Sequence, residues 1–178
     1  MNAEFKLMLH PIDPDYSIDF AGLKVLLKDI KLLGEALSDT HYAVGDNFLS
    51  QLTFMGCSPD IELEPHPHKA YCYIEIEDHE HRQFVAGVNL KKARCTFCKG
   101  EVKSVTAEAT CSICQKTLEL EKINWRKSAF VAKTWITIGN IYELEAIPND
   151  ALLDTLEKAT GVKWKPVYIR QSNKITLS

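Results

Sequence analysis

The stretch Cys95-Thr96-Phe97-Cys98 is followed, twelve residues later, by Cys111-Ser112-Ile113-Cys114. Two Cys-x-x-Cys pairs can bring four thiolates together as the tetrahedral, all-sulfur set that suits a structural metal ion and leaves no open coordination position. Gly100 fits the tight turn after the first pair because glycine adopts positive φ angles freely, and the second pair has no such glycine. The spacing predicts one metal site with these ligands: Cys95, Cys98, Cys111 and Cys114.

The segment between the two pairs is long enough for one strand out and one strand back, and Val102, Val105 and Thr106 favour strands. On these residues, the stretch 95–114 resembles a zinc ribbon or the metal-binding end of a rubredoxin. The resemblance implies Zn²⁺ as the cofactor. Iron is the alternative, since a four-thiolate tetrahedron serves both metals, but neither pair shows the Pro and Gly of a rubredoxin-like Cys-Pro-x-Cys-Gly.

The composition is that of an ordinary globular protein: 178 residues, of which 46% are apolar and 25% charged, enough for one good core. The apolar patch at the N-terminus is short and interrupted by Lys6, which is not the pattern of a signal peptide. No apolar run approaches the length of a membrane span. Without an export signal the six cysteines are expected to be reduced, which favours metal over disulfides and predicts a cytoplasmic protein.

The first part of the chain predicts a strand and a helix. The strand covers Phe5–Leu9. Apolar residues at three- and four-residue spacing over Leu23–Leu37 predict an amphipathic helix that Ser17 or Asp19 caps. Inside this helix Gly34 costs roughly 1 kcal/mol relative to alanine.

The next part predicts two hairpins. The first covers residues 41–54, because the Gly-Asp pair at its centre suits a two-residue turn. The second consists of a strand over Tyr71–Glu77, a polar turn over Asp78–His81 and an antiparallel return over Gln83–Leu90. In the first of these strands Cys72 alternates with polar residues, so we expect its side chain in the core.

Beyond the cysteines, the pattern predicts a strand over Thr117–Ile123 and an apolar, central strand over Ala129–Ile138. A helix then begins at a cap within 148–150 and ends at Gly161. A last strand over Val162–Arg170 precedes a tail that we expect to be loose.

No Pro- or Ser-rich linker separates the cysteine stretch from the strands on either side of it. We therefore predict that residues 1–90 and 126–178 form one domain and that residues 91–125 are an excursion from it. The predicted class is α+β, a mainly antiparallel sheet with two amphipathic helices and an inserted zinc ribbon.

Two further groups suggest chemistry. His66 and His68, and likewise His79 and His81, have a spacing that can chelate a metal ion. The strand between the pairs separates them by roughly 20 Å, so we expect solvated loop histidines that share no ion. Cys57 is a candidate nucleophile, but a reactive thiol needs basic neighbours and none stands nearby in the sequence, so we expect a structural cysteine.

Charge is concentrated around the cysteines. Between Lys91 and Lys133 there are ten basic and four acidic residues, a balance of +6, whereas the whole chain carries −3 and the remainder therefore −9. Basic residues interleaved with aromatic ones suit phosphate contacts and base stacking. We predict that nucleic acid, or alternatively an acidic protein partner, contacts these residues: Lys91, Lys92, Arg94, Lys99, Lys103, Trp125, Arg126 and Lys127.

The leading hypothesis is a non-enzymatic zinc-binding protein whose basic ribbon contacts nucleic acid or an acidic protein. One alternative is a rubredoxin-like electron carrier with iron in the same cysteines. Another is a thiol enzyme that uses Cys57 and a histidine-rich loop. No membrane partner is expected, because the chain offers no apolar span.

Overall fold

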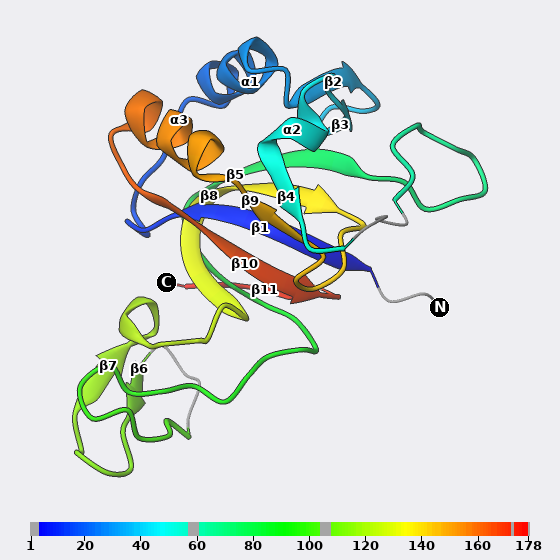
Figure 1. Cartoon of the computed structure of the whole chain (residues 1–178). Coiled ribbons are helices and arrows are strands. Elements are labelled where there is room, and N and C mark those ends of the chain that lie inside the picture. Colours follow the sequence, from blue (N-terminus) through cyan, green and yellow to red (C-terminus); the bar gives the residue numbers. More distant parts are fainter. Residues whose placement is uncertain (1–3, 57–60, 104–107, 172, 178) are drawn as a thin grey trace.

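A computed structural model describes residues 4–56, 61–103, 108–171 and 173–177. Its centre is an antiparallel sheet with strand order β10-β1-β8-β5-β3-β2, to which β11 is added by pairing with β5 (Figure 1). The strands of this sheet are β1 (Phe5–Pro11), β2 (Leu33–Ala36), β3 (His41–Val44), β5 (Tyr73–Ala86), β8 (Ala129–Gly139), β10 (Trp164–Arg170) and β11 (Asn173–Thr176). Together with its helices, this sheet confirms the predicted α+β class.

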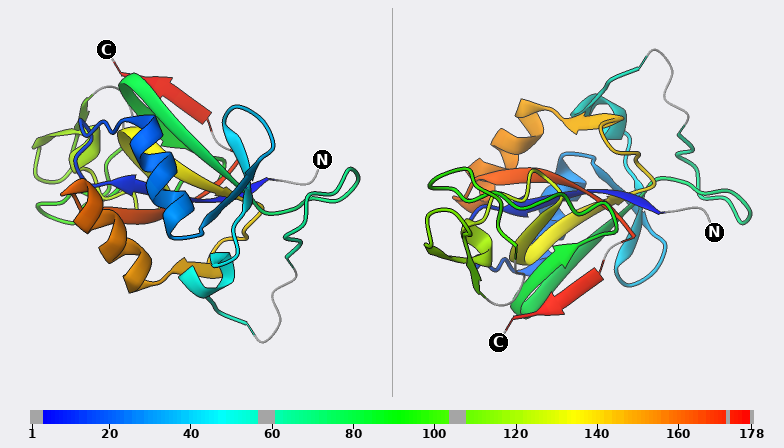
Figure 2. Two further views of the ribbon diagram at one scale, coloured as in Figure 1. Left: turned by 90° about the horizontal axis from the view of Figure 1, so that it is seen from above. Right: turned by 90° about the horizontal axis from the view of Figure 1, so that it is seen from below.

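The helices α1 (Phe20–Asp29) and α3 (Asp150–Thr160) lie over one face of the sheet, as the view from above shows (Figure 2). The single turn α2 (Phe48–Gln51) lies on the same side. It leads into β4 (Leu52–Phe54), which pairs with β9 (Ala146–Pro148) in a separate two-stranded sheet. We call the main sheet with these elements the body.

The ends of the two longer helices follow from local chemistry. The carboxylate of Asp19 accepts a hydrogen bond from the N–H of Ala21, and the side chain of Asn149 accepts one from the N–H of Leu152. Gly161 ends α3 with a φ of 74°, in the left-handed region that glycine adopts without steric cost. These caps are among those that the sequence predicts, and they are confirmed.

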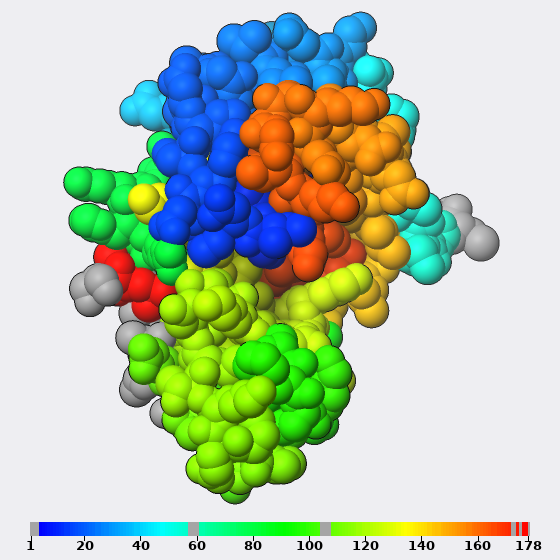
Figure 3. Space-filling model, turned by 90° about the vertical axis from the view of Figure 1, so that its left-hand side faces the viewer, coloured from blue at the N-terminus to red at the C-terminus, as the bar shows by residue number. Residues whose placement is uncertain are grey.

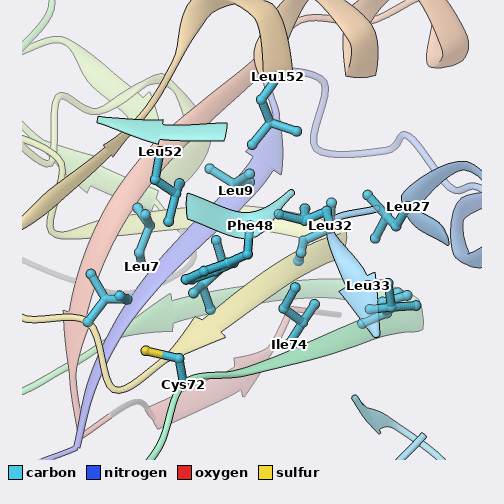
Figure 4. Packing of buried hydrophobic residues seen from close by; sticks show 14 of the residues in the cluster. Leu7, Leu9, Leu27, Leu32, Leu33, Phe48, Leu52, Cys72, Ile74 and Leu152 are labelled. Carbon is cyan, nitrogen blue, oxygen red and sulfur yellow. The ribbon is translucent and has the colours of Figure 1, made fainter. Parts of the chain in front are cut away.

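The main core lies between the helices and the sheet (Figure 4). Leu7 from β1 and Ile74 from β5 are buried in one cluster with Leu27 of α1 and Leu152 of α3. The side chain of Cys72 is buried in the same cluster, as predicted. Burying each large side chain of this kind contributes about 1.5–3 kcal/mol, so this cluster is the main source of the stability of the body.

The chain leaves the sheet after β5 and returns to it in β8, and the described residues between them, 87–103 and 108–128, form a second lobe below the body (Figure 3). We call it the cysteine lobe. It contains the short antiparallel pair β6 (Glu108–Thr110) and β7 (Thr117–Glu119), followed by the 3₁₀ turn η1 (Leu120–Lys122). The predicted strand over Thr117–Ile123 is therefore wrong in its second half.

The predicted first helix is too long, because α1 ends at Asp29 and β2 follows. Lys31 has a φ of 55°, which turns the chain out of the helix. A Cβ atom on Gly34 would lie 2.6 Å from the carbonyl oxygen of Val44, so β2 and β3 can approach closely only with glycine there. Glycine at position 34 would be costly in a helix, but it is required in this pair of strands.

The predicted hairpin over 41–54 is also wrong. β3 pairs with β2 on one side and β5 on the other, while β4 pairs with β9. The glycine at the centre of the predicted turn, Gly45, instead packs against the backbone of Lys31, where a Cβ atom would lie 2.3 Å from the carbonyl oxygen. Its role is close packing rather than chain reversal.

The predicted second hairpin is one continuous strand, β5. Asp78 pairs with Thr134 of β8 and Gln83 pairs with Ala132, so a bulge in β5 takes up the residues that were predicted to turn. Before the bulge β5 pairs with β3, and after it β5 pairs with β11. The predicted loose tail is therefore wrong as well, since Asn173–Thr176 covers an edge of the sheet that would otherwise lack a partner strand.

Candidate metal centre

The structure brings the four predicted ligands together. The sulfur atoms of Cys95, Cys98, Cys111 and Cys114 all lie within 4.8 Å of one another. The sulfur of Cys95 is 3.7 Å from that of Cys114, and the sulfur of Cys98 is 3.5 Å from that of Cys111. Four sulfurs in a tetrahedron at about 2.3 Å from a central ion stand about 3.8 Å apart, so these separations fit one metal ion.

Both Cys-x-x-Cys pairs fold as the same tight turn. The N–H groups of Lys99 and Gln115 each donate to the carbonyl oxygen of the first cysteine of their pair, over 3.0 and 3.1 Å. These two residues, with φ of 65° and 58°, hold the left-handed conformation, so the prediction that Gly100 supplies it is wrong. A Cβ atom on Gly100 would lie 2.6 Å from Cδ1 of Ile113, the end of an exposed side chain that would have to turn away.

Backbone amides surround the sulfurs. The N–H groups of Gly100 and Ile113 donate to the sulfurs of Cys98 and Cys111, each over 3.4 Å. Such contacts favour the thiolate over the thiol. The backbone N–H of Cys114, followed by that of Ile113, lowers the pKa of Cys111 to about 6. Cys111 can thus give up its proton to a cation near neutral pH, whereas desolvation and the neighbouring cysteines raise the pKa of Cys114 to about 11, so that thiol loses its proton only when a cation binds.

The basic residues of the predicted contact set occupy different environments. Lys91 is half-buried and forms an ion pair with Glu143, 2.9 Å between Nζ and Oε1. Lys92 is exposed and lies 3.4 Å from a carboxylate oxygen of Glu101. The remaining predicted cations are exposed, and no ion pair joins them to any other described residue: Arg94, Lys99, Lys103, Arg126 and Lys127.

The aromatic member of the predicted contact set, Trp125, is buried. Its ring is 5.0 Å from that of Phe84, and its indole N–H donates to the carbonyl oxygen of Leu120 over 2.8 Å. The prediction that Trp125 stacks on bases is therefore wrong, because this ring belongs to the core of the cysteine lobe. The exposed aromatic residue is Phe97, at 61% exposure, with the ammonium group of Lys116 4.0 Å from its ring centre.

Sequence reasoning did not select Phe97 as a contact residue, although a signal existed. Phe97 is the third residue of a Cys-x-x-Cys turn, in which the sulfurs point inward and the residues between them point outward. The corresponding residue of the second pair, Ile113, is 69% exposed. Both middle side chains project from the turns, so each is a candidate for contact with a partner.

The other candidates form no metal site. His79 stacks on Trp135, 4.8 Å between ring centres, while His66 and His68 lie in an exposed loop. In the part of the chain that the structure describes, the four cysteines are the only group of three or more metal-binding side chains close enough to share an ion. Cys57, the candidate nucleophile, lies outside the described residues.

Comparison with known proteins gives no relative: no family model, no curated protein and no solved structure matches the chain. Among the described residues, none of the helices has the length and apolar character needed to cross a membrane. The functional argument therefore depends on the site itself.

Proposed function

We propose that the four cysteines hold one structural zinc ion and that the lobe around this ion presents a basic surface to nucleic acid. The observation that supports the metal site is the convergence of four sulfurs with backbone N–H groups directed at two of them. Four cysteines fill all four positions of a tetrahedral ion and leave none for a substrate, which favours a structural role over a catalytic one.

The cysteine lobe packs a small core against the sheet, but its own strands are too short to hold the cysteine turns in place. Its strands β6 and β7 are three residues long, and an isolated two-stranded hairpin is marginally stable at best in water. Structural zinc contributes on the order of 10–16 kcal/mol of apparent binding free energy in small zinc modules. A metal ion of this kind supplies what such short strands cannot.

The nucleic-acid half of the proposal is supported by a surface around the first cysteine turn. Arg94 donates to the carbonyl oxygen of Lys99 over 3.3 Å, and Lys99 donates to that of Thr96 over 3.4 Å, so both cations are held beside the turn. We call this the ribbon surface, and it comprises Lys92, Arg94, Phe97, Lys99, Lys103 and Lys116. Exposed cations beside an exposed ring can contact phosphates and stack on a base.

Elemental analysis of the purified protein tests the metal. We expect about one zinc per chain, and we expect Cys95→Ser to release it. The matched control is Cys72→Ser, because Cys72 is a buried cysteine of the body that lies outside the cluster, and this variant should retain its zinc. A red protein that contains iron would instead support an electron carrier.

Binding of a labelled single-stranded oligonucleotide at several salt concentrations tests the surface. Each phosphate contact releases counterions, so Lys99→Ala with Lys103→Ala should lower the salt slope by roughly one to two units. Phe97→Ala should weaken binding by roughly 1–3 kcal/mol and leave the slope nearly unchanged. Lys28→Ala with Lys69→Ala removes two exposed charges from the body and should change neither quantity.

If the protein binds no oligonucleotide at low salt, the nucleic-acid half of the proposal is wrong, while the proposed metal site is unaffected. Binding of polyglutamate with equal affinity and an equal salt slope would favour an acidic protein as the partner, because it would show that charge alone is recognised.

A further inference from the structure

A cleft of about 630 Å³ lies between the body and the cysteine lobe. Its walls come from four places: the end of β1 and the residue after it, Thr96 of the first cysteine turn, the segment from η1 to the start of β8, and β10. Figure 3 shows the side on which the start of the chain, in blue, and β10, in orange-red, approach the yellow-green lobe. A space of this size is typical of sites that hold a small organic ligand.

Four cations line the cleft, and only Lys122 among them is paired with a described carboxylate, that of Glu119. Arg126 and Lys127 come from the lobe and Lys165 from β10, and all three are exposed. No carboxylate of a described residue lies within ion-pair distance of their charged groups. The acid in the lining, Glu121, is paired with Arg82 over 2.7 Å. The lining therefore carries an excess of positive charge, which would attract a negatively charged group.

The turn that carries two of these cations has an unusual sequence. Arg126 and Lys127 have φ of 56° and 57°, and the N–H of Ser128 donates to the carbonyl oxygen of Trp125 over 3.1 Å. Consecutive positive φ angles with this hydrogen bond define a type I′ turn, in which Asn-Gly is favoured and long side chains are strained. Neither Arg126 nor Lys127 is a residue that this turn favours, so the chain keeps two cations beside the cleft at some cost in backbone energy.

The remaining lining suits a flat apolar ring. His10 stacks on Phe130 with 4.4 Å between ring centres, and its Nδ1–H donates to the carbonyl oxygen of Pro11 over 2.9 Å. Burial lowers the pKa of His10 to about 4, so it adds no charge at neutral pH and its Nε2 is an acceptor. Ile12 and Pro166 contribute apolar surface nearby.

We infer that this cleft binds one nucleotide unit of a single-stranded nucleic acid, with its phosphate at Arg126, Lys127 and Lys165 and its base against the apolar lining. The inference rests on the proposed function and deepens it, because it adds residues of the body to a surface otherwise confined to the lobe. The strand would run from the ribbon surface into the cleft, past Thr96, which lines the cleft beside Phe97.

The decisive variant is Arg126→Asn with Lys127→Gly. It removes both charges and supplies the pair that a type I′ turn prefers, so the thermal midpoint should rise while oligonucleotide affinity falls about tenfold or more. Lys165→Ala should weaken binding about tenfold and lower the salt slope by roughly one. The control is again Lys28→Ala with Lys69→Ala, which should bind like the unaltered protein.

Ultraviolet crosslinking of an oligouridylate to the zinc-loaded protein locates the contact, and crosslinked peptides should include residues 122–127 or 165–167. If the wild-type protein binds but the cleft variants bind equally well, the inference fails and the proposed function stands. If the wild-type protein binds no oligonucleotide, the proposed function itself fails. If the cleft variants lose polyglutamate binding, and a nucleotide does not compete with polyglutamate for the wild-type protein, the cleft would be assigned to an acidic protein instead.

Discussion

At the scale of single residues, Trp125 shows how burial decides a role. The same ring would serve as a stacking platform if exposed, but here it is packed on Phe84 and only 5% exposed. We expect Trp125→Ala to lower the free energy of unfolding by about 3–5 kcal/mol, the usual cost of removing a large buried ring. Urea unfolding of the zinc-loaded protein measures this, and Phe97→Ala, an exposed site, should change it by less than about 0.5 kcal/mol.

His10 couples stability to pH. Its folded-state pKa of about 4 lies below the ordinary value of 6.5, chiefly because burial disfavours the charged ring and, more weakly, because Lys165 is near. The unfolded chain therefore binds the proton more readily, and stability that is complete above pH 6.5 is lost as the pH falls toward 4. The loss reaches at most about 3 kcal/mol.

His10→Phe keeps a ring on Phe130 and removes the titration, so its stability should fall less between pH 7 and 5 than that of the wild type. The comparison is made with metal-saturated protein at each pH, because protons also compete with metal for the cysteines. If the wild type and His10→Phe lose the same stability between pH 7 and 5, His10 is not the group that couples stability to pH.

At the scale of elements, Gly34 distinguishes the observed structure from the predicted helix. In a helix, Gly34→Ala would stabilise by about 1 kcal/mol. In β2 the added Cβ meets the carbonyl oxygen of Val44 at 2.6 Å, so we expect a destabilisation of about 1–3 kcal/mol. Gly22→Ala in α1 is the matched control: its nearest contact is 3.7 Å away, and it should stabilise by about 0.5–1 kcal/mol. Thermal or urea unfolding of the two variants measures the sign of each change in stability.

The elements that the sequence predicts well are those whose signals are local. Asn149 and Gly161 define α3 through their own caps, and the mainly apolar sequence of β8 indicates a strand buried on both faces. The failures are non-local. Nothing near Asp78 in the sequence reveals that β8 pairs with β5 on both sides of a bulge, because that register depends on Thr134 and Ala132, which are far away in the sequence. Likewise Lys165 joins the cleft only because β10 lies beside the lobe.

At the scale of the whole molecule, the two lobes share structure. Phe84, Ala129 and Val131 of the sheet lie in the same hydrophobic cluster as Leu118 and Trp125 of the cysteine lobe. Arg82 of β5 bonds both Asp15 of the body and Glu121 of the lobe. The lobe is thus fixed against the body, which is the condition for a cleft between them to keep its shape.

Removal of the metal should therefore unfold the cysteine lobe and the adjoining ends of the sheet, but not the whole protein. With the ion chelated, we expect amides of residues 91–125, and of the sheet ends around Phe84 and Val131, to exchange rapidly with solvent. Amides of α3 and of β8 at Ile136 and Ile138 belong to the separate main cluster and should remain protected. Hydrogen exchange before and after chelation, with zinc added back as the control, measures this. Full protection of the lobe without metal would refute the structural role of the ion, and global exchange would refute the independence of the main core.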